Sequence, residues 1–213
     1  MCYEQSVEHS EQSQNLLRLC ASALPPSTQA LAPPASTVFL HNSLTRVTDI
    51  LKQYITSSDV SFLYSVLFSP FLPSTSPASR YPLSCPLLVN QSDENGWSPI
   101  HHCATVSTPS VEILNALYCA GADVSLFTTQ ERFTALHCLA RFYQPGGPES
   151  VQAMCSFVWH LVAQLRAPLG AIDTEDETPL HIAAEHGHCL ELVMILLECD
   201  LNGDVKEMRN ARG

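Results

Sequence analysis

The sequence predicts an all-α fold assembled from repeated helix-turn-helix units, and three observations support that prediction. A short segment recurs as SPIHHCA at 98–104, TALHCLA at 134–140 and TPLHIAA at 178–184. Apolar residues follow the first and third copies at the three-and-four spacing of one helical face. The chain also contains 15 prolines and 8 glycines, which favours short, punctuated elements over a few long ones.

Each copy of the segment has the residue types that start a helix. Ser98, Thr134 and Thr178 stand where a side-chain oxygen can cap the first turn. Pro99 and Pro179 follow at the first helical position, where a missing N–H costs nothing. A histidine comes two residues after that position in every copy. The complete motif is Ser98, Pro99 and His101, then Thr134 and His137, then Thr178, Pro179 and His181.

These segments resemble the TPLHxAA core of the ankyrin repeat, whose unit is about 33 residues long. The resemblance covers residues 90–213 well and residues 37–56 weakly. It implies a solenoid of helix-turn-helix units with β-hairpin turns. Because one unit cannot bury its apolar face alone, stacked neighbours would share a continuous core. The resemblance further implies that the three motif histidines hydrogen-bond the hairpin backbone and neighbouring repeats.

Composition divides the chain into four parts. Residues 1–36, rich in Ser, Gln, Ala and Pro, are predicted to form a flexible, disordered tail. Residues 37–68 are predicted to be helical, as a cryptic first repeat, and 69–89 to form a Pro/Ser-rich loop. Repeats are assigned to 90–125, 126–172 and 173–204, with the start of another at 205–213. The repeats are degenerate, and we expect the chain to be a piece of a longer ankyrin-repeat protein.

The charge of the chain is uneven. Residues 1–89 have a net charge of −1, whereas residues 90–213 have a net charge of −10. An acidic half argues against nucleic acid, which needs a basic surface, and against anionic membranes. It favours a protein partner with a basic surface, although surplus acid also serves solubility alone.

Compartment and membrane segments are predicted from the same composition. The most apolar run, residues 60–72, is too short to span a bilayer. The start of the chain has no basic and apolar pattern of a signal peptide. Nine cysteines without a CxxC pair indicate free thiols in a reducing compartment, the cytoplasm or the nucleus.

The family's concave surface of hairpin tips and inner helices binds proteins, and the resemblance implies the same use here. Trp97 follows the turn glycine at a variable position, and aromatic anchors dominate many interfaces. Its alternative role is packing on the neighbouring hairpin. Arg132 and Glu177 are assigned the equivalent position on the next two hairpins. The predicted contact residues are Asp93, Glu94, Trp97, Arg132, Glu175 and Glu177.

Histidine and cysteine clusters raise two further hypotheses. His101, His102 and Cys103, and likewise His186, His188 and Cys189, combine zinc-ligating types, but neither cluster has a CxxC or HxxxH pair. We therefore expect no metal and no cofactor. Three functions stay open: a non-enzymatic scaffold or adaptor, the regulatory ankyrin segment of a larger enzyme or transcriptional regulator, and a hydrolase using Cys and His.

Overall fold

A computed structural model describes residues 48–68, 89–186 and 189–212. The chain divides into two compact units, Met1–Asn42 and Ser43–Gly213, and every described residue belongs to the second. The tail predicted at 1–36 and all but the last residue of the loop predicted at 69–89 lie outside the described residues, and Val89 is helical. Within the described ranges all regular structure is helical, as the sequence predicts. The expected β-hairpins are not confirmed, because none of these residues is in a strand.

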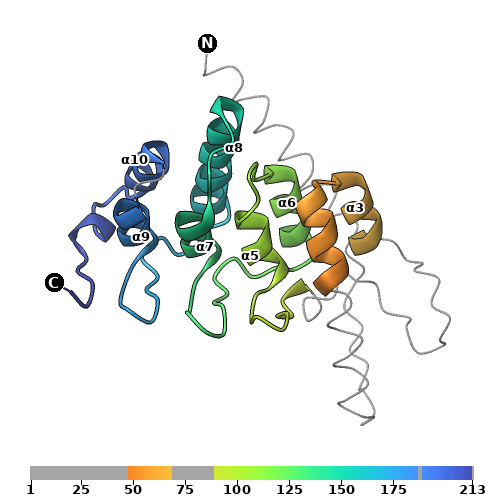
Figure 1. Cartoon of the computed structure of the whole chain (residues 1–213), viewed down its shortest axis with the longest axis horizontal. Helices are drawn as coiled ribbons and strands as arrows, with labels where there is room; N and C mark the ends of the chain where they lie inside the picture. The colour runs from red at the N-terminus through yellow and green to blue at the C-terminus, as the bar shows by residue number, and fades with distance from the viewer. Residues whose placement is uncertain (1–47, 69–88, 187–188, 213) are drawn as a thin grey trace, which may run out of the picture. The chain divides into compact units, whose positions relative to one another are not determined.

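The described helices come in pairs that follow one another along the unit (Figure 1). The first pair is formed by residues 48–57 and by α3 (Val60–Phe68). The second is α5 (Pro99–Ala104) with α6 (Val111–Cys119). The third is α7 (Ala135–Phe142) with α8 (Pro148–Trp159), which continues into a π-helical turn, η1 (His160–Gln164). The fourth is α9 (Pro179–His186) with α10 (Leu190–Cys199), and a 3-10 turn, η2 (Val205–Glu207), follows.

The pairs stack into two layers of helices. In one layer α5 packs on α7 and α7 on α9, and in the other α3, α6, α8 and α10 pack in that order. Figure 1 shows the two layers running side by side through the unit. One cluster of buried hydrophobic side chains extends from Leu51 to Val205, so the described helices share a continuous core. This is the shared core expected of stacked units.

Small residues let the helices of one layer approach closely. Ala104, Ala140 and Ala183 are buried at or near the ends of α5, α7 and α9. The predicted helix starts are also observed, because Pro99 begins α5 and Pro179 begins α9. Ala135 begins α7 without a proline, since the cap and not the proline defines the start.

The third pair absorbs the extra residues that the sequence places in its repeat. Residues 143–147 lie between α7 and α8, and Gly147 adopts a φ of 147° just before α8. The helix α8 is 12 residues long and η1 adds 5 more, against 9 residues in α6. The π-helical turn η1 continues α8 directly, and a single turn attached to an α-helix is the form in which the rare π-helix mostly occurs.

Candidate functional site

The motif histidines fasten the start of each inner helix to the next loop along the stack. The Nδ1 atom of His101 accepts a hydrogen bond from the Ser98 N–H at 3.1 Å. Its Nε2 atom lies 3.0 Å from the carbonyl oxygen of Leu126. A carbonyl can only accept, so Nε2 carries the proton and Nδ1 does not. The ring is therefore held in one neutral tautomer.

The other two histidines repeat this arrangement. His137 accepts from the Thr134 N–H and donates to the carbonyl of Glu177 at 3.0 Å. His181 accepts from the Thr178 N–H at 3.1 Å and donates to the carbonyl of Met208 at 3.1 Å. These hydrogen bonds to the backbone of the following loop are of the kind that the resemblance implies for the three histidines.

Burial excludes charge from this part of the molecule. Desolvation lowers the pKa of His101 to about 4, and it lowers the pKa of His137 as well. Because both ring nitrogens of each histidine already have a partner, neither nitrogen is available for a metal ion. Among the residues that the structure describes, no group of three or more His, Cys, Asp or Glu side chains is placed to hold a metal ion.

A tight loop precedes each of the helices α5, α7 and α9. We call these loops the first, second and third tip loops, residues 93–97, 128–133 and 173–177. An acidic side chain closes two of them. Asp93 Oδ1 accepts from the N–H groups of Asn95 and Trp97, each at 2.9 Å. Asp173 Oδ1 accepts from the N–H groups of Glu175 and Glu177 at 2.8 and 2.9 Å. These side chains hold the loops in shape.

Two of the acids that were predicted as contact residues have buried side chains. The Asp93 side chain is only 5% exposed, because it is turned into its own loop. Glu177 is 7% exposed, and its Oε1 accepts from the Asn210 amide at 3.0 Å. Glu94 and Glu175 are exposed as expected, and Glu175 pairs with Arg212 at 3.3 Å.

The structure also corrects the position assigned to Arg132. Gly96, Arg132 and Asp176 share a positive φ, of 80°, 57° and 59°, so these three residues are equivalent. The residue equivalent to Trp97 is therefore Phe133, which stacks on His137 with ring centroids 5.7 Å apart. Arg132 is exposed at the loop tip, and its guanidinium lies 5.2 Å from the ring of Phe127. The second tip loop, 128–133, is one residue longer than the other two, and this extra residue shifts the alignment of the three loops.

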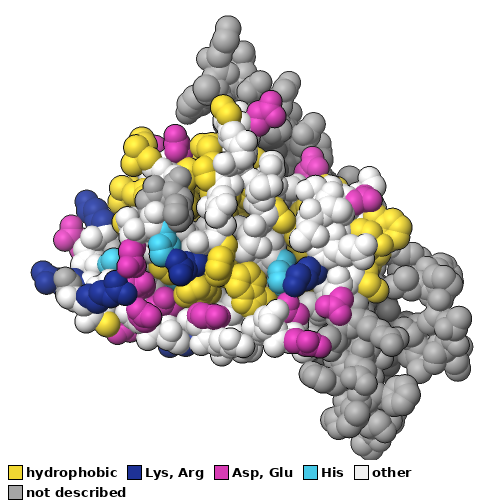
Figure 2. Space-filling model, viewed as in Figure 1, with side chains coloured by type: hydrophobic (Ala, Val, Ile, Leu, Met, Phe, Trp, Pro, Cys, Tyr) yellow, Lys and Arg dark blue, Asp and Glu magenta, His cyan; other side chains and the backbone are white. Residues whose placement is uncertain are grey.

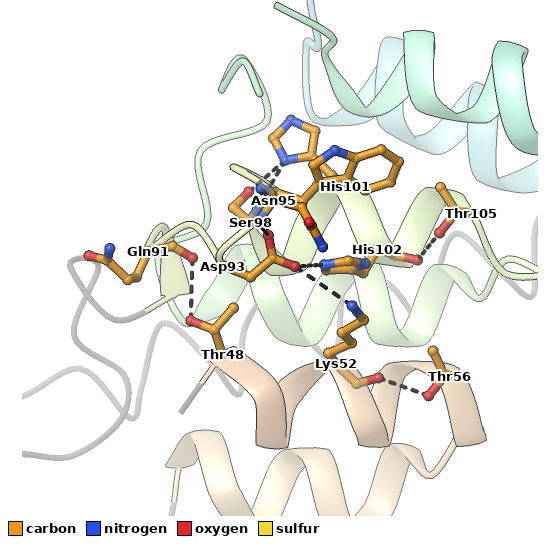
Figure 3. Close-up of polar contacts among 11 residues, drawn as sticks. Thr48, Lys52, Thr56, Gln91, Asp93, Asn95, Ser98, His101, His102 and Thr105 are labelled. Carbon is orange, nitrogen blue, oxygen red and sulfur yellow. Dashed lines mark hydrogen bonds and ion pairs between the residues drawn. The ribbon is translucent and has the colours of Figure 1, made fainter. Parts of the chain in front are cut away.

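An ion-pair network ties the first helix pair to the second (Figure 3). Asp93 Oδ2 lies 2.9 Å from His102 Nε2 and 3.7 Å from Lys52 Nζ. Burial alone would raise the pKa of Asp93, but hydrogen bonds from Trp97 and His102 outweigh it and the pKa is lowered. Burial lowers the pKa of His102, which the contact with Asp93 only partly offsets. His102 is thus a neutral donor to a charged carboxylate.

Aromatic side chains gather above this network on the face of α5 and α7. The ring of Trp97 lies 5.3 Å from that of Phe142 and 5.4 Å from that of His102. Phe142 is 45% exposed, whereas Trp97 is half-buried. Figure 2 shows hydrophobic side chains at the centre of this face, between histidine and cationic side chains and above a row of acidic ones. An open hollow beside them is lined by Asn95, Trp97, His102, Gln130 and Glu131.

Consecutive tip loops are joined by single backbone hydrogen bonds. The Thr129 N–H donates to the carbonyl of Gly96, and the Thr174 N–H to that of Glu131, each at 3.2 Å. The Ala211 N–H donates to the carbonyl of Glu175 at 3.3 Å. The loops therefore form one continuous edge next to the aromatic face.

The family model for the ankyrin repeat in three copies matches residues 107–209. Residues 107–209 are ankyrin repeats. Ankyrin repeats are generally modules of protein–protein interaction. The described part of this array has the helical stacking of such repeats. Residues 90–106 precede the match, but Ser98 and His101 make the same pair of contacts as their counterparts inside the array.

Sequence reasoning missed three residues at or next to the aromatic face. Lys52 belongs to the first helix pair, and no motif connects it with Asp93. Phe142 lies beyond the end of the TALHCLA segment. Phe133 was obscured by the longer loop. The hydrophobic pattern of α7 could have indicated that Phe142 is exposed. This apolar residue follows Arg141 and lies outside the buried stripe of the helix.

Within the described parts of the ankyrin array and the helices before it, no helix is both long and apolar enough to cross a membrane.

Proposed function

We propose that the face made by the tip loops and by α5 and α7 is the partner-binding surface, and that the chain acts as a scaffold or adaptor without a catalytic step of its own. The observation that carries this proposal is the aromatic pair of the half-buried Trp97 and the exposed Phe142 beside an open hollow. Aromatic side chains next to a concave, partly polar surface are typical interface anchors.

The tip loops favour a partner with a basic surface. Glu94 and Asp176 are exposed at the loop tips, where their carboxylates are available to lysine and arginine side chains, and the exposed Glu175 already pairs with one such side chain, Arg212. Only Arg132 among the tip-loop residues has a positive charge. Electrostatic complementarity of this kind sets specificity and association rate more than affinity.

A reducing compartment, the cytoplasm or the nucleus, fits this function. Cys103, Cys138 and Cys189 are buried as free thiols. Buried free thiols persist where disulfides are not formed.

The test compares Phe142→Ala with Tyr118→Ala in an affinity capture using the full chain. The two side chains are similarly exposed, at 45% and 39%, but Tyr118 lies on α6 in the other layer. We expect partners that are retained by wild type and Tyr118→Ala but lost from Phe142→Ala, with matching circular dichroism for all three. Direct binding of each captured protein is then measured by titration. Equal capture of the same partners by both variants would contradict the proposal that the aromatic face binds them.

A further inference from the structure

The helix α10 presents an apolar stripe to solvent. Leu190, Met194 and Leu197 are 69%, 51% and 42% exposed. Their spacing places them on successive turns of one helical face. Leu192 and Leu196 are buried on the opposite side of the helix, which packs against α8 and α9. The helix is therefore apolar on both of its sides.

The neighbouring helix of the same layer shows that this is not a general property of the fold. On α8 the exposed residues at comparable spacing are Glu149, Gln152 and Ser156, all polar, and only Trp159 at its end is apolar. A helix that is apolar all round is normally covered by another element. The exposed stripe of α10 thus indicates a surface that is covered when the protein is engaged.

Carboxylates flank this stripe on one side. Glu191 and Glu198 are seven residues apart on the helix, so they lie on the same side of the stripe, and both are exposed. The Cys189 thiol donates to Glu191 Oε2 at 3.4 Å. Residues 185–207 contain six carboxylates and one lysine, so the surroundings reinforce the acidic flank. Figure 2 shows hydrophobic side chains gathered over α10, at the upper left of the view, with acidic side chains beside them.

We propose that the exposed stripe of α10 docks an amphipathic helix from another protein, one with an apolar seam and a lysine- or arginine-rich flank. The helical spacing of Leu190, Met194 and Leu197 matches an apolar seam of the same spacing on a facing helix. The carboxylates of Glu191 and Glu198 select a basic flank, because an acidic one would meet like charge. A helix seated there would pack on α10 as α10 already packs on α8.

This surface is separate from the aromatic face of the tip loops. The stripe belongs to the layer formed by α3, α6, α8 and α10. Trp97 lies in a tip loop and Phe142 in α7, which is part of the other layer. The proposal therefore stands or fails independently of the function proposed for the aromatic face.

The test uses two synthetic peptides of equal length, each with leucines at the spacing of one helical stripe. Lysines flank the stripe in one peptide and glutamates in the other, and a fluorescent label reports binding to the full chain by anisotropy. We expect the lysine peptide to bind at least about tenfold more tightly. Glu191→Lys with Glu198→Lys should reverse that preference, and Met194→Glu should abolish binding of the lysine peptide.

Control variants and sedimentation separate the alternatives. Gln152→Lys with Ser156→Lys on α8, and Phe142→Ala on the aromatic face, should leave lysine-peptide binding unchanged. Circular dichroism verifies that each variant folds. Equal binding of both peptides, or unchanged binding after the double charge reversal, overturns the proposal. So does a concentration-dependent dimer that Met194→Glu abolishes, because the stripe would then be occupied by a second copy of this chain.

Discussion

At the scale of single residues, the molecule depends on histidines whose rings accept one hydrogen bond and donate another. His101, His137 and His181 each accept a backbone N–H at Nδ1 and donate from Nε2 to a carbonyl in the following loop. A protonated ring could no longer accept at Nδ1, so the cap of the helix would lose its bond. The same side chain therefore caps a helix and joins two repeats.

Replacing one of these rings tests their contribution to stability. His137→Ala leaves the Thr134 N–H and the Glu177 carbonyl without their ring partner, and His137 itself is completely buried. We expect the free energy of unfolding to fall by about 2–4 kcal/mol, from unpaired polar groups and a cavity. Urea denaturation followed by circular dichroism measures the change. Gln152→Ala on the exposed side of α8 is the control, and a loss of similar size there would contradict the assignment.

The buried histidines also predict how stability depends on pH. The pKa of His101 is about 4 in the folded state, below its ordinary value of 6.5, because burial disfavours the charged ring. The unfolded chain therefore binds a proton that the folded chain does not, and stability is lost as pH falls from 6.5 towards 4. His101 alone should cost about 2 kcal/mol at pH 5.

Urea denaturation at pH 7.5, 6.5 and 5.5 gives that dependence directly. The pKa values of His102, His137 and His160 are also lowered by burial, so they act in the same direction. His137→Ala, which lacks one of these rings, should show a shallower decline than wild type. A midpoint that does not change over this pH range would mean that the rings are not held neutral.

Some residue roles could be predicted from the sequence because they depend on neighbours in the chain. The Ser98 N–H donates to the ring of His101 three residues later, and that relation needs no tertiary information. The burial of Asp93 was not predictable in this way, since Lys52 and His102 reach it from two different helix pairs. Arg132 was assigned to the wrong loop position for two reasons. Its loop has no glycine to mark the turn, and the loop is one residue longer than the others.

At the scale of elements, each tip loop depends on one residue with a positive φ. Gly96 fills that position in the first loop with a φ of 80°. Its carbonyl accepts from the Thr129 N–H, so the two loops touch backbone to backbone. Arg132 and Asp176 occupy the same conformation in the next loops, where there is room for a side chain at the tip. Only the first loop therefore requires glycine sterically as well as conformationally.

Gly96→Ala tests this requirement. A Cβ atom at Gly96 would lie 1.8 Å from Thr129 Oγ1 and 3.0 Å from Thr129 Cβ, so the first and second loops would have to separate. The positive φ adds about 1–2 kcal/mol for a residue with a side chain, and we expect a total loss of roughly 2 kcal/mol or more. Gly146→Ala is the matched control, because its nearest neighbour is Ser150 Cβ at 3.9 Å. The urea midpoint should fall only for Gly96→Ala.

Helices and caps were predictable where the repeat is regular, and less so where it is interrupted. The number of extra residues in the third repeat could be read from the sequence. How they divide between a loop and a longer helix could not be predicted from it. Burial of Met154, Phe157 and Leu161 along α8 and η1 decides that distribution, because these residues fill the space between α6 and α10. Tertiary packing, not local preference, set the length of this helix.

At the scale of the whole described unit, stability comes from stacking. The core cluster is continuous from the first helix pair to Val205, and no described pair has a core of its own. Which side chains share a surface follows from that stacking: Trp97 and Phe142 are far apart in sequence but 5.3 Å apart in space. A sequence motif cannot report such a pair, since it depends on the rise from one repeat to the next.

Cysteine labelling measures how cooperatively the stack opens. Cys103 in α5 and Cys138 in α7 are 1% and 0% exposed, and burial raises the pKa of both thiols. Neither can react with an alkylating reagent until its layer opens. Cys199, at the end of α10, is only partly buried and serves as the internal reference. We expect labelling of Cys103 and Cys138 to be roughly 100-fold slower or more than that of Cys199 in the absence of urea.

The two buried thiols lie in different repeats, so their relative rates identify the unit of opening. Because α5 packs directly on α7, we expect Cys103 and Cys138 to become reactive together as urea increases, with equal dependence on its concentration. Mass spectrometry of the labelled peptides follows each site separately. If Cys138 reacted well before Cys103, the third repeat would open by itself, and its long insertion would be the weak point of the array.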